Sequence, residues 1–301
     1  MIVATLLWAT AGVMARQITH ASGIQITFGR SFFACLSTLL LLRIWRGPNF
    51  FRRIQWREPL LWISSACWAV MFTAFMLALS FTTVANVLVL SALTPVFTAL
   101  VGRFWLRHKL PQRTWITIMV AALGVIYIYA AHFTLGNERK FLGSAIALLV
   151  PLAACLQWTL MHREQSRRSS CAEKNPQESV KVRDLIPAVA IGGGMSALIC
   201  LPFIWPLNCT LSDVGWMAAL GMFQLALPSS LAVVASRVLH GPEMALLALL
   251  EILFGIALTW WGAGEVPGPN VLIGGSLVVV ALATNEWLGW RQQHITKPST
   301  S

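Results

Sequence analysis

Residues 59–106 decide the fold: PLLWISSACWAVMFTAFMLALS-FTT-VANVLVLSALTPVFTALVGRFWL. They form two apolar runs, 59–80 and 84–106, joined only by the turn Phe81-Thr82-Thr83. A membrane-spanning helix needs about 20 predominantly apolar residues, so each run is long enough to cross a bilayer. The runs are apolar on all sides, whereas the strands of a membrane β-barrel would alternate polar and apolar residues. The stretch therefore predicts two antiparallel transmembrane helices.

The rest of the chain repeats this pattern. Of its 301 residues 57% are hydrophobic and only 11% are charged, and the mean hydropathy is +0.70. A soluble protein carries about 25% charged residues, so the composition excludes a soluble or disordered chain. We predict an all-α membrane protein with ten spans: 1–17, 24–43, 59–80, 84–106, 113–131, 141–161, 184–204, 214–236, 242–263 and 269–290.

The basic residues predict the orientation of these spans. In a ten-span topology, 18 of the 22 Lys and Arg residues lie on one side of the membrane, in the segments 43–57, 103–113, 163–183, 237 and 291–297. Basic loops stay in the cytoplasm, so both termini are expected there. The net charge of +11 then reflects topology and contact with anionic lipid, and requires no nucleic acid. No basic stretch precedes residues 1–17, so we interpret them as a span and not as a signal peptide.

The ten spans divide into two halves. An offset of 157 residues pairs four identical residues of the two halves. The pairs are Ala78 with Ala235, Leu90 with Leu247, Leu93 with Leu250 and Phe97 with Phe254. Each half has an odd number of spans, so the second half must be inverted, a common plan among transporters. We predict repeats over 1–131 and 141–290, with a flexible cytoplasmic loop at 162–183 and a tail at 291–301.

Several stretches in order resemble one family, the EamA-type permeases of the drug/metabolite transporter superfamily. They are Leu7-Trp8-Ala9-Thr10, Phe28-Gly29-Arg30-Ser31-Phe32-Phe33-Ala34, Thr83-Val84-Ala85-Asn86, Thr94-Pro95-Val96-Phe97-Thr98-Ala99-Leu100, Gly221-Met222-Phe223-Gln224, Glu243-Met244-Ala245, Leu250-Glu251 and Gly262-Ala263-Gly264-Glu265. The resemblance implies a ten-helix permease of the bacterial inner membrane that exports or exchanges a small metabolite, often an amino acid. The chain departs from the family pattern at Arg107-His108-Lys109, at Ile252 and in the longer loop 162–183.

Two ionisable residues lie within predicted spans. Glu251 is in the middle of span nine, and Arg30 is about two turns into span two. A charge inside a membrane is costly and marks a functional site by default. Glu251 is a candidate for proton coupling or for binding a substrate amine, and Arg30 for binding a carboxylate. The alternatives are a protonated packing residue for Glu251 and a side chain that reaches the outer surface for Arg30.

Other candidates are uncharged. Buried amides and hydroxyls need hydrogen-bond partners, which a substrate or another helix can supply. Three deep tryptophans can stack on an apolar substrate or pack between helices. The substrate-binding or coupling candidates besides Glu251 and Arg30 are Gln224, Trp8, Thr10, Trp68, Gln157, Trp158 and Ser229. Asn86 opens span four and is expected to cap that helix.

Nothing in the chain indicates an enzyme. The six His are not paired at metal-binding spacing, and no C-x-x-C, G-x-S-x-G or phosphate-loop pattern occurs. We expect no catalytic residues, no metal and no cofactor. The leading function is export or exchange of an amino acid or related compound, driven by a proton or substrate gradient. The alternatives are export of drugs or lipophilic cations, which would rely on Glu251 and the tryptophans, and a membrane scaffold or sensor without transport.

Overall fold

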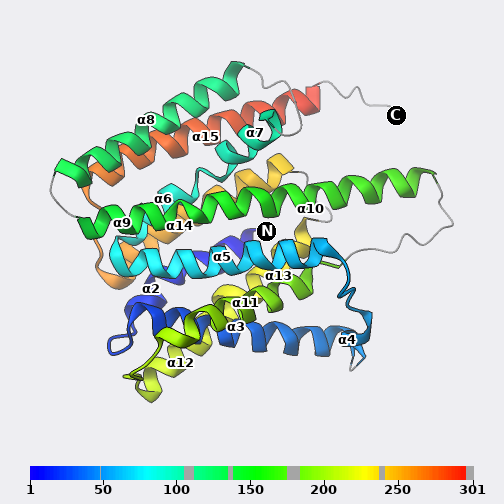
Figure 1. The fold of residues 1–301 in the computed structure, drawn as a ribbon. Coiled ribbons are helices and arrows are strands. Elements are labelled where there is room, and N and C mark those ends of the chain that lie inside the picture. Colours follow the sequence, from blue (N-terminus) through cyan, green and yellow to red (C-terminus); the bar gives the residue numbers. More distant parts are fainter. Residues whose placement is uncertain (48, 105–111, 135–137, 175–183, 237–240, 296–301) are drawn as a thin grey trace.

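The computed structural model describes residues 1–47, 49–104, 112–134, 138–174, 184–236 and 241–295, and all regular elements within them are helical (Figure 1). The helices are α1 (Ile2–Ala9), α2 (Ala11–Arg16), α3 (Gly23–Arg46), α4 (Phe50–Arg53), α5 (Pro59–Phe81), α6 (Val84–Ser91), α7 (Thr94–Phe104), α8 (Gln112–Thr134), α9 (Glu138–Ala147), α10 (Leu149–Lys174), α11 (Ile186–Cys200), η1 (Leu201–Phe203), α12 (Leu211–Ala219), η2 (Leu220–Ala226), α13 (Leu227–Ala235), α14 (Gly241–Ala263) and α15 (Pro269–Ile295). The prediction of an all-helical protein is confirmed for the described residues.

Among the described residues, seven helical segments are long and apolar enough to cross a membrane. They are Gly23–Arg46, Pro59–Phe81, Val84–Val101, Glu138–Met161, Ile186–Phe203, Leu211–Ala235 and Pro269–Gly289. Shorter apolar helices, Ile2–Arg16, Gln112–Tyr127 and Leu250–Ala263, lie where the other three spans were predicted. The helical pair predicted from residues 59–106 is present over its described part, and the total of ten spans stays a prediction.

Three of the predicted continuous spans are interrupted. The first breaks at Thr10, between α1 and α2, and the fourth breaks at residues 92–93, just before Pro95 in α7. Proline cannot donate a backbone hydrogen bond, which weakens the helix at this point. The eighth span contains η2, a π-helical turn that ends two residues before Pro228. Irregular backbone at membrane depth occurs where it is buried in protein or lines a cavity.

The segment 162–183 was predicted to be a flexible loop, and its first part is helical instead. Helix α10 continues past the predicted end of the sixth span to Lys174 (Figure 1). Residues 162–174 contain both basic and acidic residues and neither proline nor glycine, so they are compatible with continuing the helix. Residues 175–183 lie outside the described part of the chain.

The helix starts follow local capping rules. Ser22 and Gln25 form a reciprocal capping box at the start of α3. At the start of α6 the cap is Thr83, whose hydroxyl accepts a hydrogen bond from the backbone N–H of Asn86. The prediction that Asn86 caps this helix is therefore wrong. Its amide nitrogen donates instead to Thr82, at 3.0 Å, and to Ser144 of α9, at 2.7 Å.

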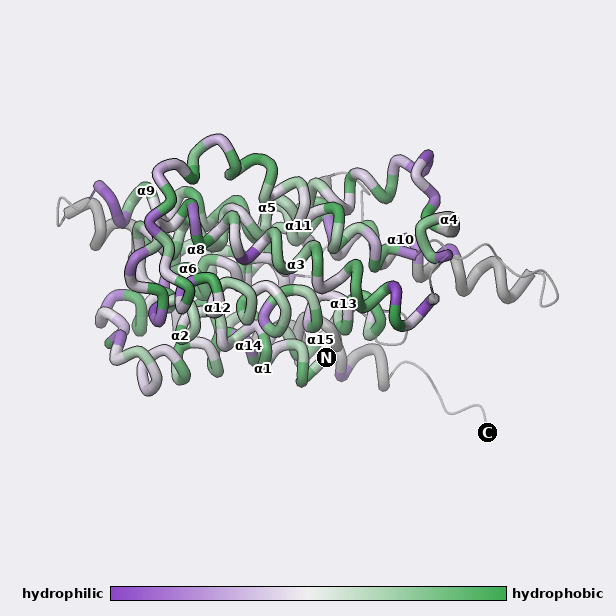
Figure 2. Tube along the Cα trace, turned by 90° about the horizontal axis from the view of Figure 1, so that it is seen from below, coloured by the Kyte–Doolittle hydropathy of each residue, from purple (hydrophilic) through white to green (hydrophobic). Residues whose placement is uncertain are grey.

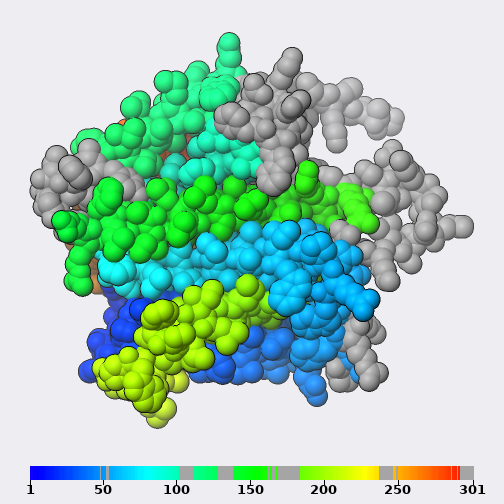
Figure 3. Space-filling model, in the orientation of Figure 1, coloured from blue at the N-terminus to red at the C-terminus, as the bar shows by residue number. Residues whose placement is uncertain are grey.

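Helix α11 packs between α3 and α5, and two of its glycines lie close to these two helices. A Cβ atom on Gly192 would lie 2.6 Å from the Cβ of Trp68, and one on Gly193 would lie 3.0 Å from the carbonyl oxygen of Ser31. Helices α5 and α10 lie side by side on one face of the molecule (Figure 3).

Hydrophilic residues gather mainly towards two opposite ends of the bundle (Figure 2). The arrangement suits a protein whose middle lies in hydrocarbon.

Candidate functional site

Arg30 lies in the interior of the bundle, on α3, and is only 1% exposed. Its guanidinium carbon lies 6.0 Å from the ring centre of Phe72 and 5.7 Å from that of Phe75, both on α5. Its Nε and Nη1 atoms have no hydrogen-bond partner among the described residues. The alternative in which Arg30 reaches the outer surface is therefore wrong.

An unpaired cation in this position is energetically unfavourable. Burying a charge without a counter-ion costs on the order of several kcal/mol. Two aromatic faces recover only part of this cost, at about 0.5–2 kcal/mol for each cation–π contact. The guanidinium thus lacks a counter-ion among the described residues.

The backbone of Arg30 is held against the second half of the chain. A Cβ atom on Gly221, in η2, would lie 2.7 Å from the carbonyl oxygen of Arg30 and 2.6 Å from the Cβ of Phe33. Only glycine permits this approach of α3 to η2. Gln224 follows three residues later in the same π-helical turn, and it is 3% exposed with its Oε1 atom lacking a donor among the described residues. Such π-helical turns are frequent at functional sites.

A continuous face of α5 links Arg30 to Gln157 of α10. The rings of Phe72 and Trp68 lie 5.4 Å apart, and the indole Nε1 of Trp68 is buried with no acceptor in the described part of the chain. One turn earlier, Ser64 donates a hydrogen bond of 2.9 Å to the Oε1 of Gln157. The Nε2 of Gln157 is left without an acceptor there.

Helix α13 adds hydroxyl groups to the same region. The Oγ atoms of Ser229 and Ser230 are buried, and neither has a partner among the described residues. Leu225 and Val233, on either side of these serines, pack in one apolar cluster with Trp68 and Phe72. Six residues of these packed helices have buried polar atoms without a partner among the described residues, and we refer to them as the polar cluster: Arg30, Trp68, Gln157, Gln224, Ser229 and Ser230. Thr38 of α3 also has such a hydroxyl and is not included.

Five of the nine residues proposed from the sequence are members of the polar cluster, namely Arg30, Gln224, Trp68, Gln157 and Ser229. Trp8 and Trp158 are partly buried and pack against the apolar cluster that contains Trp68 and Phe72. Thr10 does not supply a free hydroxyl, because its Oγ1 donates to the carbonyl of Leu7 at 2.7 Å, at the break between α1 and α2. A role for any of these residues in binding stays a prediction.

Glu251 is in a different environment. It is partly exposed on α14, one turn before Gly255, whose added Cβ would lie 3.8 Å from the Cα of Ala9. In the described part of the chain, no hydrogen bond or ion pair connects Glu251 to Arg30 or to another residue. The structure therefore does not bring the two predicted ionisable residues into contact.

Sequence reasoning missed Phe72, Phe75 and Ser64. The spacing of residues 64, 68, 72 and 75 places them on one face of a helix, and this was the available signal. That pattern also describes any buried apolar face, so it did not distinguish a site from ordinary packing.

The helices and the buried polar residues define the general class as a multi-pass helical membrane protein. The model of the EamA-like transporter family matches residues 1–130. This match confirms the resemblance for the first 130 residues, which are similar to transporters of the drug/metabolite transporter type. A solved crystal structure has the same fold, with a TM-score of 0.61 over 94% of both chains at 14% identity. No curated protein matches the chain.

Proposed function

We propose that this transporter moves a small organic metabolite with a carboxylate group, such as an amino acid or a related compound, by alternating access. The single observation that carries the proposal is the buried Arg30, whose Nε and Nη1 atoms have no acceptor among the described residues. A guanidinium binds a carboxylate through two parallel hydrogen bonds. An incoming carboxylate would thus supply the counter-ion that this region lacks.

The surroundings of Arg30 favour a substrate that also has an apolar part. Phe72 of α5 lies beside the guanidinium, and the ring of Trp68 lies 5.4 Å from that of Phe72 on the same helix. Amide and hydroxyl groups of Gln224 and Ser229 are available for further polar contacts. A lipophilic cation would be repelled by Arg30, so the alternative of a drug or cation exporter has less support.

The proposal includes a topology. Ten spans form two inverted repeats over residues 1–131 and 141–290, and both termini lie in the cytoplasm of a bacterial cell, with the chain in the inner membrane. The seven long apolar helices and three shorter ones support the number of spans. The bias of basic residues supports the orientation. Contacts of α3 with η2 and α11 support a binding region between the halves.

The test is transport by purified protein in liposomes. The vesicles are loaded with a mixture of amino acids, other carboxylates, nucleosides and lipophilic cations, and mass spectrometry follows which compounds leave. We expect selective loss of carboxylates, abolished by Arg30→Gln. The matched control is Arg43→Gln, on the exposed surface of the same helix. Selective loss of cations would contradict the proposal, and no loss from folded protein would favour the scaffold alternative.

A further inference from the structure

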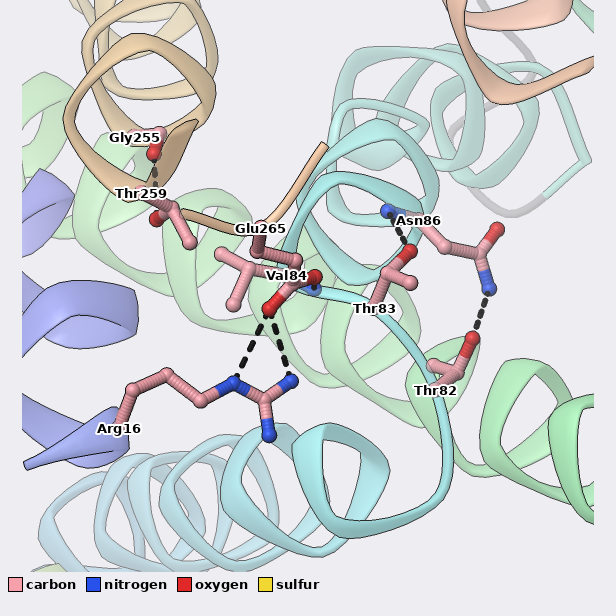
Figure 4. Close-up of polar contacts among 8 residues, drawn as sticks. All are labelled: Arg16, Thr82, Thr83, Val84, Asn86, Gly255, Thr259 and Glu265. Carbon is pink, nitrogen blue, oxygen red and sulfur yellow. Dashed lines mark hydrogen bonds and ion pairs between the residues drawn. The ribbon is translucent and has the colours of Figure 1, made fainter. Parts of the chain in front are cut away.

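Glu265 connects three separate elements at one end of the bundle. Its Oε2 atom accepts from Nε of Arg16 at 3.0 Å and pairs with Nη2 of Arg16 at 2.9 Å, at the end of α2. Its Oε1 atom accepts from the backbone N–H of Val84, the first residue of α6, at 2.7 Å (Figure 4). Glu265 itself lies between α14 and α15. We call Arg16, Val84 and Glu265 the Glu265 latch.

Local sequence explains why Glu265 reaches these partners. Helix α14 ends at Ala263, and Gly264 has a φ of +64°, which is the left-handed region that favours glycine. The chain turns there and carries the Glu265 side chain back over the start of α6. The N–H groups in the first turn of a helix have no partner within the helix. Glu265 supplies an acceptor for one of them, at the positive end of the α6 dipole.

A second ion pair lies at the other end of the bundle. Arg46, the last residue of α3, pairs with Asp184, just before α11. The short connection from Arg16 to the start of α3 at Gly23 places the Glu265 latch near one end of this 24-residue helix, and Arg46 is at the other end. The helix is about 36 Å long, at 1.5 Å per residue, which is enough to span a membrane.

Both ion pairs cross between the two halves of the chain. Arg16, Val84 and Arg46 belong to the first half, whereas Glu265 and Asp184 belong to the second. The structure therefore holds the halves together at both ends at once. In alternating access the halves must separate at one end while the other stays closed.

We propose that the Glu265 latch is a gate that keeps its end of the bundle closed and must open during each transport cycle. The inference rests on the proposed alternating-access function. The Arg16 side chain is 42% exposed and that of Glu265 is 17% exposed. An ion pair accessible to water is weak enough to break and reform. In the proposed orientation this gate faces the outside of the cell.

The test measures access to a buried position behind the latch. Ala11 lies on α2, five residues before Arg16, is 2% exposed and packs in the same apolar cluster as Val84. Ala11→Cys is introduced into a protein whose own six cysteines are replaced by serine or alanine. The rate of labelling by a membrane-impermeant maleimide is measured in liposomes with and without Glu265→Gln. Arg16→Gln removes the ion pair from its other side and serves as a second variant.

We expect both variants to speed labelling about fivefold, as for a modest shift of a two-state equilibrium. Glu138→Gln, at an exposed glutamate on α9 at the same end, is the matched control and should leave the rate unchanged. Equal labelling rates in the parent, Glu265→Gln and Arg16→Gln would contradict the proposal that the Glu265 latch is a gate. Faster labelling in Glu138→Gln as well would also overturn it, because the effect would be general loosening.

Transport is measured separately on the same samples. If the parent moves no compound in the panel, the proposed function fails, but the labelling rates still decide whether Glu265 holds this end closed. If the parent transports and the labelling rates are equal, only the latch fails. Folding of each variant is checked by its elution profile and melting temperature before labelling.

Discussion

The guanidinium carbon of Arg30 lies 6.0 Å from the ring centre of Phe72, and its Nε and Nη1 contact no acceptor among the described residues. The two residues come from adjacent helices, α3 and α5, in the interior of the bundle. Aromatic rings stabilise a cation without neutralising it. The charge of Arg30 therefore stays without a counter-ion among the described residues, at a cost to the stability of the protein.

Replacing Arg30 should separate stability from binding. Arg30→Met removes the buried charge and keeps much of the side-chain volume, so we expect the melting temperature without substrate to rise or stay equal. Binding of the carboxylate substrate should weaken by about 100-fold, because its charge partner is lost. Thermal melts with and without substrate measure both effects. A lower melting temperature in Arg30→Met together with unchanged binding would show that Arg30 is structural.

The contact of Gly221 with α3 should tolerate no side chain. Gly221→Ala would place a Cβ atom 2.7 Å from the carbonyl oxygen of Arg30, so α3 and η2 must move apart. We expect a loss of about 1–3 kcal/mol in stability and reduced transport. Gly215→Ala is the matched control, since a Cβ there meets nothing within 4 Å. Thermal unfolding in detergent measures the stability, and equal melting temperatures for the two variants would contradict the prediction.

The hydrogen bond between Ser64 and Gln157 should couple α5 to α10. We expect Ser64→Ala and Gln157→Leu together to cost less than the sum of the single changes. The difference should be about 0.5–1.5 kcal/mol, the usual net value of one hydrogen bond. A double-mutant cycle by chemical denaturation checks this value. Strict additivity would mean that the bond does not contribute in the membrane protein.

Glu251 is the remaining candidate for coupling. Glu251→Gln preserves the shape of the side chain and removes its charge and its titratable proton. We expect transport driven by a pH gradient to fall about tenfold or more, while exchange of substrate between the two sides continues. Both fluxes are measured in the same liposomes, and the amount of protein in the membrane is the control. If a pH gradient drives the variant and the parent equally, the coupling role is wrong.

The hydrophobic pattern alone predicted the helices and their class. The apolar runs at 59–80 and 184–204, for instance, are long and carry one charged residue between them, Asp184, so they are stable as helices in hydrocarbon. Arg30 was found in the same way, because a charge within an apolar run is rare. The extension of α10 to Lys174 was missed, because polar residues are equally compatible with a helix and a loop.

The tertiary structure decided which residues meet. Phe72 and Arg30 are 42 positions apart in the chain, and Arg16 and Glu265 are 249 apart. No local pattern encodes such pairs, because they depend on how the helices pack against each other. The close approach of Gly221 to α3 is an example. The sequence thus determined the helices and the buried charge, since hydrophobic burial depends on each residue's own chemistry. Their partners were decided by packing, which depends on the shape of every neighbouring helix at once.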